Sequence, residues 1–196
     1  MIADDHPLYT EGLKNFLSDD FTITDIVEDG SKAVDKALKK KPEVILMDIG
    51  MPELDGIEAT RRILAIRDMP VVFLTNHSER AYVKRIKKIT NYGYVLKNAG
   101  EFVLIETINM AFNLFDAKQA LEREKEKYKQ VVESTEEAVI TFNGDGIVLL
   151  INHKGAAILG GAPRDFMGKN IKDFLPPENA ERGLRILRSV METGQS

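Results

Sequence analysis

Polar side chains follow four apolar segments in the first half of the chain, and their types could do chemistry together. They are Asp4-Asp5, Asp48, Thr75 and Lys97. The apolar run 44–47, which ends at Asp48 and a turn, is typical of a parallel strand covered on both faces. Parallel strands end at one edge of a sheet, where open α/β folds bind ligands, so these side chains are expected to meet there.

The three carboxylates would repel one another at that edge, and a bound cation or a shared proton must relieve the repulsion. Because oxygen ligands favour a hard ion, we predict that Asp4 and Asp5 bind Mg²⁺. Asp48, the middle carboxylate, is predicted to be the nucleophile that carries a phosphoryl group. Lys97 can offset the negative charge on the phosphoryl oxygens, and the Thr75 hydroxyl can donate a hydrogen bond to them.

The elements that must position these groups alternate between strand-like and helix-like over roughly the first 100 residues. The strand-like segments are 1–3, 21–27, 44–48, 71–74 and 92–96. Amphipathic helices are expected between them, and Ser31 is a candidate N-cap for the second helix. The segment 79–89 is also expected to be helical. This alternation predicts an α/β fold with a parallel, doubly wound sheet of five strands.

A long helix is predicted next, from about Glu101 to Ser134, because neither proline nor glycine occurs between Glu101 and Asn143. A heptad repeat runs along it, with Glu124 as its flaw. The a and d positions are Leu114, Ala117, Leu121, Glu124, Tyr128 and Val131. Two interpretations remain open: a coiled coil across a dimer, or a single amphipathic helix that packs on its own domain.

The last part of the chain changes character again. Two strand-like segments, 138–142 and 147–151, flank Asn143-Gly144-Asp145-Gly146, which is a strong hairpin signal. A short helix is expected at 156–159, and another at 182–192. Two strands and short helices cannot close a sheet domain, so we predict a partial α+β domain.

Composition limits the classes of function. The net charge of −4 argues against electrostatic DNA binding by the chain as a whole. The lack of cysteine excludes disulfides, thiolate metal sites and cysteine nucleophiles. No apolar run approaches the roughly 18 residues that span a bilayer, and the first residues do not form a signal peptide. We therefore expect a soluble cytoplasmic protein, with no membrane contact and no direct nucleic-acid binding in this segment.

Residues 1–115 resemble the receiver domain of two-component response regulators. The matching sequences are Asp4-Asp5-His6-Pro7, Met47-Asp48-Ile49-Gly50-Met51-Pro52 with Asp55-Gly56, Thr75, and Lys97 with Tyr94 before it. The resemblance implies a flavodoxin-like fold and a phospho-acceptor signalling protein rather than an enzyme. It also implies a partner, a histidine kinase or phosphotransfer protein, that places a phosphoryl group on Asp48.

The same resemblance implies a set of metal ligands. Asp5 would hold Mg²⁺ directly and Asp4 through water. Asp48 and the main-chain carbonyl of Gly50 would complete the protein ligands. His6 is expected to help position this loop rather than to act chemically.

Two further roles follow from the resemblance, together with two departures from the family pattern. Thr75 and Tyr94 would be a switch pair that moves when Asp48 is modified, and Lys97 would hold the phosphoryl group. Asn98 stands where the family usually has proline after the lysine, so a cis peptide bond of the X-Pro kind is not expected there. Asn76 is larger than the residue usually found after the switch threonine.

From about residue 133 the chain resembles the first part of a PAS sensor domain. The matching features are the strand-like segments, the Asn-Gly-Asp-Gly turn and the run 156–161 that continues to Phe166 and Gly168. The expected organisation is a receiver domain at 1–115, a helical linker at 116–134 and an incomplete PAS-like domain at 135–196. A homodimer through the last receiver helix and the linker is expected, and the sequence predicts no particular PAS ligand.

The leading hypothesis is a response regulator that accepts a phosphoryl group on Asp48 and relays the change through the helix to the PAS module. Alternatives are a phosphatase that turns over through Asp48, a degenerate receiver used for dimerisation, and a regulator with a DNA-binding or enzymatic output beyond Ser196. Against the phosphatase stands Gly50, which leaves no second acid two residues after Asp48.

Overall fold

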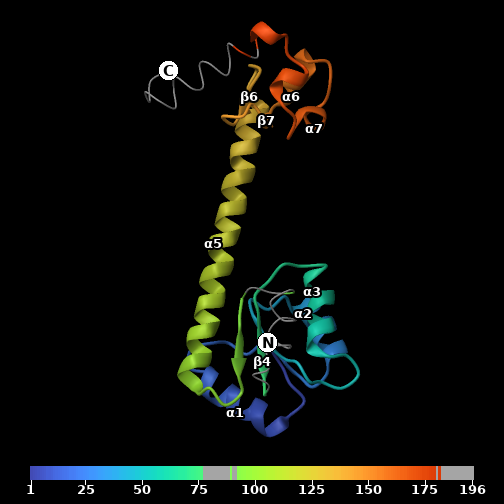
Figure 1. Cartoon of the computed structure of the whole chain (residues 1–196). Coiled ribbons are helices and arrows are strands. Elements are labelled where there is room, and N and C mark those ends of the chain that lie inside the picture. Colours follow the sequence, from blue (N-terminus) through green and yellow to red (C-terminus); the bar gives the residue numbers. More distant parts are fainter. Residues whose placement is uncertain (77–88, 90–91, 180, 182–196) are drawn as a thin grey trace. The chain divides into compact units, whose positions relative to one another are not determined.

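The computed structural model describes residues 1–76, 89, 92–179 and 181 (Figure 1). It divides the chain into two compact units, Met1–Ala120 and Leu121–Ser196. The helix predicted at 79–89 lies almost entirely outside the described residues, and the one predicted at 182–192 lies wholly outside them. In the part of the chain that the structure describes, no helix is long and apolar enough to cross a membrane.

A five-stranded parallel sheet forms the centre of the first unit, with strand order β2-β1-β3-β4-β5. The strands are β1 (Ile2–Ala3), β2 (Ile26–Val27), β3 (Ile45–Asp48), β4 (Val71–Thr75) and β5 (Tyr94–Leu96). The predicted fold class is therefore confirmed. The short β1 pairs with β2 on one side and with β3 on the other.

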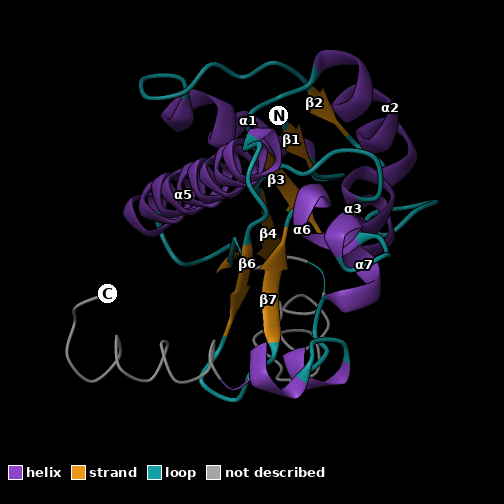
Figure 2. Cartoon of the chain, turned by 90° about the horizontal axis from the view of Figure 1, so that it is seen from above, coloured by secondary structure: helices purple, strands orange, loops and turns teal. Residues whose placement is uncertain are grey.

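Helices cover both faces of this sheet, with α1 and the first part of α5 on one face and α2 and α3 on the other (Figures 1 and 2). They are α1 (Pro7–Leu17), α2 (Gly30–Lys40), α3 (Gly56–Leu64) and α5 (Glu101–Ser134). Successive strand residues point to opposite faces. In β3, for example, Ile45 and Met47 pack on the α2–α3 side and Leu46 packs on the α1–α5 side. Both faces are apolar, which explains the continuous apolar runs of the sequence.

Two local predictions were wrong in detail. The second strand covers only Ile26–Val27 of the predicted segment 21–27. The N-cap of α2 is Asp29, not Ser31: its carboxylate accepts a hydrogen bond of 2.7 Å from the Lys32 amide. The first residue of the helix, Gly30, lies against the main chain of Leu54: a Cβ there would be 2.0 Å from the Leu54 oxygen, so only glycine allows this close approach.

The described part of the second unit is an antiparallel hairpin with short helices. Its elements are β6 (Ile140–Phe142), β7 (Val148–Ile151), α6 (His153–Ile158), α7 (Pro163–Phe166) and the 3₁₀ helix η1 (Ile171–Asp173). The hairpin turn predicted from Asn143 and Gly146 is present. Asn143 accepts hydrogen bonds from the amides of Asp145 and Ile147, and Gly146 has a φ of 82°.

Asn152 holds the second unit together where α5 ends and α6 begins. Its side chain is fully buried and makes four hydrogen bonds. The carbonyl oxygen accepts from the amides of Val139 and Gly155, at 3.0 and 2.8 Å. The amide nitrogen donates to the carbonyls of Val132 and Glu137, at 3.1 and 2.8 Å. The last turn of α5 is thereby joined to the hairpin and to α6.

The substitution Gly56→Ala is expected to destabilise the first unit, because the added Cβ would lie 1.8 Å from the main-chain oxygen of Asp48. Overpacking of this kind lowers the free energy of unfolding by about 1–3 kcal/mol or more. Gly12→Ala is the matched control, since Gly12 lies in α1 with open space around it. Alanine is the better helix former and should raise the free energy of unfolding by about 0.5–1 kcal/mol. Urea unfolding followed by circular dichroism measures both. Equal stability of the two variants would contradict the close approach.

Candidate functional site

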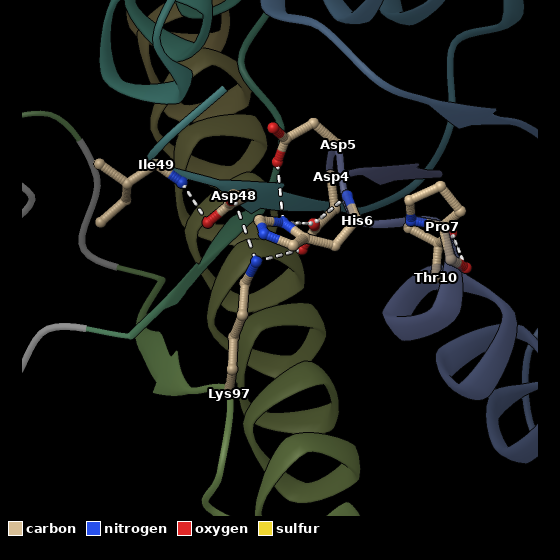
Figure 3. Close-up of polar contacts among 8 residues, drawn as sticks. All are labelled: Asp4, Asp5, His6, Pro7, Thr10, Asp48, Ile49 and Lys97. Carbon is tan, nitrogen blue, oxygen red and sulfur yellow. Dashed lines mark hydrogen bonds and ion pairs between the residues drawn. The ribbon is translucent and has the colours of Figure 1, made fainter. Parts of the chain in front are cut away.

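The predicted site residues meet at one edge of the sheet, as Figure 3 shows for Asp4, Asp5, Asp48 and Lys97. Asp4 and Asp5 directly follow β1, Asp48 ends β3, and Lys97 directly follows β5. Every strand pair of this sheet is parallel, so the strand ends lie at a common edge. The topology therefore brings together groups that are up to 93 residues apart in the chain, from Asp4 to Lys97.

Lys97 bridges two buried carboxylates at the centre of the site. Its Nζ lies 2.6 Å from Oδ2 of Asp4 and 3.1 Å from Oδ2 of Asp48. Asp4 is 2% exposed and Asp48 4%, so neither charge is well hydrated. The main-chain nitrogen of Lys97 donates a 2.9 Å hydrogen bond to the carbonyl of Thr75. This bond ties the main chain of Lys97 to the end of β4. Lys97 thus contacts the acids although Asn98, rather than the proline usual in the family, follows it.

The environment of Asp48 opposes its negative charge on balance. Burial, and then the nearby Asp4 carboxylate, raise the pKa of Asp48 above the ordinary aspartate value. Lys97 and a 2.8 Å hydrogen bond from the Ile49 amide to Oδ1 act in the other direction without cancelling the rise. A second positive charge at this edge would stabilise the ionised carboxylate.

His6 lies among the carboxylates although its side chain is 63% exposed (Figure 3). Its Nδ1 is 2.9 Å from Oδ1 of Asp5 and 3.2 Å from Oδ1 of Asp4. Its main-chain nitrogen also donates to Asp4 Oδ1, at 3.0 Å. This main-chain bond agrees with the expectation that His6 helps to position the loop. The ring contacts, in addition, bring the Nδ1 nitrogen into the acidic cluster.

The other predicted residues lie on β4, on β5 and in the turn after β3. Thr75 ends β4 and is 2% exposed, while Tyr94 begins β5 and is 37% exposed. Gly50 is exposed in the turn after β3. Their roles in switching and in metal binding stay predictions.

Tyr9 is a site neighbour that the sequence did not reveal. Lys97 Nζ lies 4.9 Å from the centre of the Tyr9 ring, a distance suited to a cation–π contact. Burial, and then the charges of Asp4 and Asp48, raise the pKa of Tyr9 to about 12. Nothing in the spacing of Tyr9 separates it from an ordinary residue of an amphipathic helix, so only the packing of α1 against β5 places it here.

The acidic cluster has the donor set of a divalent cation site. One ligand atom from each of Asp4, Asp5, His6 and Asp48 lies within 4.8 Å of the other three. Two buried oxygens, Asp4 Oδ2 and Asp5 Oδ1, are each in contact with a single nitrogen, Lys97 Nζ at 2.6 Å and His6 Nδ1 at 2.9 Å. Carboxylate oxygens with unused acceptor capacity are ligands that Mg²⁺ accepts.

Comparisons with known proteins agree with this fold and site. The model of the response regulator receiver domain matches residues 1–109, and the PAS fold matches residues 126–196. The transcriptional regulatory protein DegU of Brevibacillus brevis is 39% identical over 113 residues, which are 56% of this chain and 48% of DegU. This chain spans about half the length of the curated relatives it matches.

Two solved structures extend the comparison to multidomain proteins. One is the N-terminal domain of a response regulator/sensory box/GGDEF 3-domain protein from Carboxydothermus hydrogenoformans. It is 39% identical with a TM-score of 0.55, and the match covers 60% of this chain and 95% of that chain. The other is the signal receiver domain of a modulated diguanylate cyclase from Desulfovibrio desulfuricans G20. It is 27% identical with a TM-score of 0.55, and the match covers 60% of this chain and 94% of that chain.

The chain belongs to the response regulator receiver family of two-component systems, since the receiver model matches more than half of it. More particularly, it is a receiver domain followed by a PAS domain. Receiver domains interact with histidine kinases or phosphotransfer proteins and generally use Mg²⁺ at an acidic pocket. Here that pocket corresponds to the cluster of Asp4, Asp5 and Asp48.

Asp48→Asn is expected to stabilise the metal-free protein by about 1 kcal/mol at neutral pH. A folded-state pKa above the unfolded value means that protonated Asp48 favours folding. This stabilisation is complete below the ordinary aspartate pKa and is lost as the pH rises through the raised value. Asparagine keeps an oxygen for the Ile49 amide without the charge.

Thermal unfolding in a chelator, at neutral and at acidic pH, measures the effect, and the gain should shrink at acidic pH. Adding Mg²⁺ should then raise the melting temperature of the wild type more than that of the variant. Asp35→Asn is the control, because Asp35 forms a surface ion pair with Lys39 that contributes little. A variant that melts below the wild type in the chelator would contradict the crowding of carboxylates.

Proposed function

We propose that this chain is the input part of a two-component signalling protein, in which Asp48 accepts a phosphoryl group from a phosphohistidine. The position of Asp48 carries the proposal: a buried carboxylate at a strand end, flanked by two acids and a lysine. An oxygen of Asp48 attacks phosphorus while the phosphorus–nitrogen bond breaks. The histidine of the kinase or phosphotransfer protein leaves with the electron pair, and an acyl phosphate forms on Asp48.

The remaining acids would hold the metal ion for this transfer. Asp5, Asp48 and the main-chain carbonyl of Gly50 would bind Mg²⁺ directly, and Asp4 would bind it through water. The ion supplies positive charge that offsets the phosphoryl oxygens. This role is supported by the cluster itself, whose possible ligand atoms all lie within 4.8 Å of one another.

Lys97 and Thr75 would serve the phosphoryl group after transfer. Lys97 Nζ would exchange its contact with a carboxylate oxygen for one with a phosphoryl oxygen, a short movement because it already lies 3.1 Å from Asp48. Thr75 would donate its hydroxyl to another phosphoryl oxygen and move inward. Tyr94, partly exposed in this structure, would follow it and become buried.

A small phosphodonor such as acetyl phosphate, with Mg²⁺, should add one phosphoryl group to the wild type, and Asp48→Asn should abolish the addition. The reason is that the transfer needs a carboxylate nucleophile at the strand end. Intact-protein mass spectrometry counts the groups added. Unchanged labelling of the variant would remove Asp48 from its proposed role.

The matched control is Asp35→Asn, which removes an exposed carboxylate from α2 and should label like the wild type. The same reaction also tests the phosphatase alternative. Continuous release of phosphate from a phosphate ester would favour an enzyme. A single, slowly lost phosphoryl group favours a phospho-acceptor.

The domain order supports an enzymatic output over a DNA-binding one. The Carboxydothermus protein, by its description, joins a response regulator to a sensory box and a GGDEF domain, and this chain joins a receiver to a PAS domain in the same order. We propose a receiver at 1–115, a helical linker at 116–134 and a PAS module at 135–196. The output would then lie in a further domain of a longer protein.

The proposed relay runs along α5 and requires a second copy of the chain. Large apolar side chains stay exposed on this helix at heptad spacing, although the buried part of the helix packs on the sheet. They are Met110, Leu114, Leu121, Tyr128 and Val131, with exposed fractions from 48% to 68%. A heptad stripe of this kind is covered by an identical stripe in a parallel coiled coil. We call these residues the α5 stripe.

The far end of the relay is the junction between α5 and the PAS module. Asn152 binds the Val132 carbonyl in the last turn of α5. Glu133 accepts two hydrogen bonds from His153, one from its main-chain nitrogen at 3.0 Å and one from Nδ1 at 2.7 Å. A rotation or shift of the helix end would therefore move the start of α6 and the hairpin.

Replacing Glu124, the flaw in the heptad repeat that contains the α5 stripe, should strengthen dimerisation. Glu124→Leu places an apolar side chain at a d position of both helices, and we expect the dissociation constant of the dimer to fall at least about tenfold. Glu126→Leu is the matched control: it adds the same side chain two residues away, on the opposite side of the heptad, and should leave association unchanged. Sedimentation equilibrium measures both variants.

The relay also predicts that phosphorylation changes this association. Acetyl phosphate with Mg²⁺ should shift the monomer–dimer equilibrium of the wild type but not that of Asp48→Asn. If Glu124→Leu and Glu126→Leu behave alike, the α5 stripe does not form the dimer. If labelled wild-type protein keeps both its oligomeric state and its helix contacts, the relay does not run along α5.

A further inference from the structure

The imidazole of His6 has a position that the start of α1 does not require. His6 is the N-cap residue of α1, but its side chain makes no capping hydrogen bond. Its main-chain nitrogen already fixes the loop through Asp4. The ring nevertheless turns toward the acidic cluster and places Nδ1 near oxygens of both Asp4 and Asp5 (Figure 3).

The spacing of these atoms is that of neighbouring ligands around one ion. Two ligands at right angles, each about 2.1 Å from a metal, lie about 3.0 Å apart. Nδ1 of His6 lies 2.9 Å from Oδ1 of Asp5, the acid proposed to bind the metal directly. Asp4 Oδ1, which is 3.2 Å from Nδ1, belongs to the acid proposed to bind through water. Lys97 contacts other oxygens of the cluster, Oδ2 of Asp4 and Oδ2 of Asp48, so it does not compete with the imidazole for the same ones.

We propose that His6 is a metal ligand through Nδ1 and that this site therefore favours divalent transition ions such as Mn²⁺ over Mg²⁺. Mg²⁺ binds oxygen and keeps its water, whereas imidazole is a good ligand for first-row transition ions. A neutral imidazole offers one unprotonated nitrogen, which serves as the ligand. The proposal rests on the acidic metal site of the proposed function and adds a nitrogen and a metal preference to it.

Pulsed electron paramagnetic resonance of the full chain with Mn²⁺ tests the ligand directly. A hyperfine coupling from a directly bound nitrogen is expected in the wild type. It should disappear in His6→Phe, which keeps an aromatic ring and removes both nitrogens. Because the His6 side chain is 63% exposed, this substitution should not disturb folding, and His6→Ala provides a second variant.

Titration calorimetry with each ion tests the metal preference. His6→Phe should weaken Mn²⁺ binding about tenfold or more, at least the loss that follows removal of an outer-shell partner, and leave Mg²⁺ binding within about twofold. His153→Asn is the matched control. Its histidine is exposed and pairs with Glu133 in the other unit, so it should keep both the nitrogen coupling and the Mn²⁺ affinity.

The outcomes separate this inference from the proposed function. If Mn²⁺ binds without nitrogen coupling, or if His6→Phe weakens both ions equally, His6 is not a ligand, even when Asp48 is labelled normally with Mg²⁺. If Asp48 is labelled with neither ion, the phospho-acceptor function fails instead. Nitrogen coupling that His6→Phe removes, together with a selective loss of Mn²⁺ affinity, supports the proposal.

Discussion

The shortage of positive charge at one edge of the sheet is the constraint on which the site depends. Two carboxylates, Asp4 and Asp48, are buried there, and a third, Asp5, is partly buried beside them. Lys97 is in direct ion-pair contact with both buried acids. Desolvation makes the charges costly, and one ammonium group cannot balance three of them. The site is therefore poised to gain stability from any cation that binds the remaining oxygens.

The fold keeps this unfavourable arrangement in place through backbone packing rather than through the site's own contacts. Each acid follows or ends a strand that is hydrogen-bonded on both sides and apolar on both faces. Gly56 lets the start of α3 approach the main chain of Asp48, which fixes the end of β3. The core thus supplies the stability that the crowded carboxylates reduce, as is common at functional sites.

The sequence predicted the sheet and the meeting of Asp4, Asp5, Asp48 and Lys97 because strand ends are encoded locally, by apolar runs that stop at polar residues. It predicted α5 from Glu101 to Ser134 for the same kind of reason, an uninterrupted helical segment. It did not distinguish Asp29 from Ser31 as a helix cap, because both residue types are good N-caps and they stand only two positions apart. Tyr9 was missed as a site neighbour because its position follows from tertiary packing, whereas His6 was expected in the site loop but without the contacts that its ring makes with Asp4 and Asp5.

Phosphorylation would act on the same charge imbalance, which gives the relay a physical starting point. A phosphoryl group on Asp48 replaces one buried negative charge by a larger and more extended one, and Lys97 would shift its contact toward it. Lys97 is joined through its main chain to the end of β4 and directly follows β5, so its movement would affect the strands against which the first turns of α5 pack. At its other end α5 is bound by Asn152 and His153. A helix that packs on the sheet at one end and is held by specific hydrogen bonds at the other, with an apolar stripe exposed between them, can transmit a change in its pairing, whereas a flexible linker would absorb it.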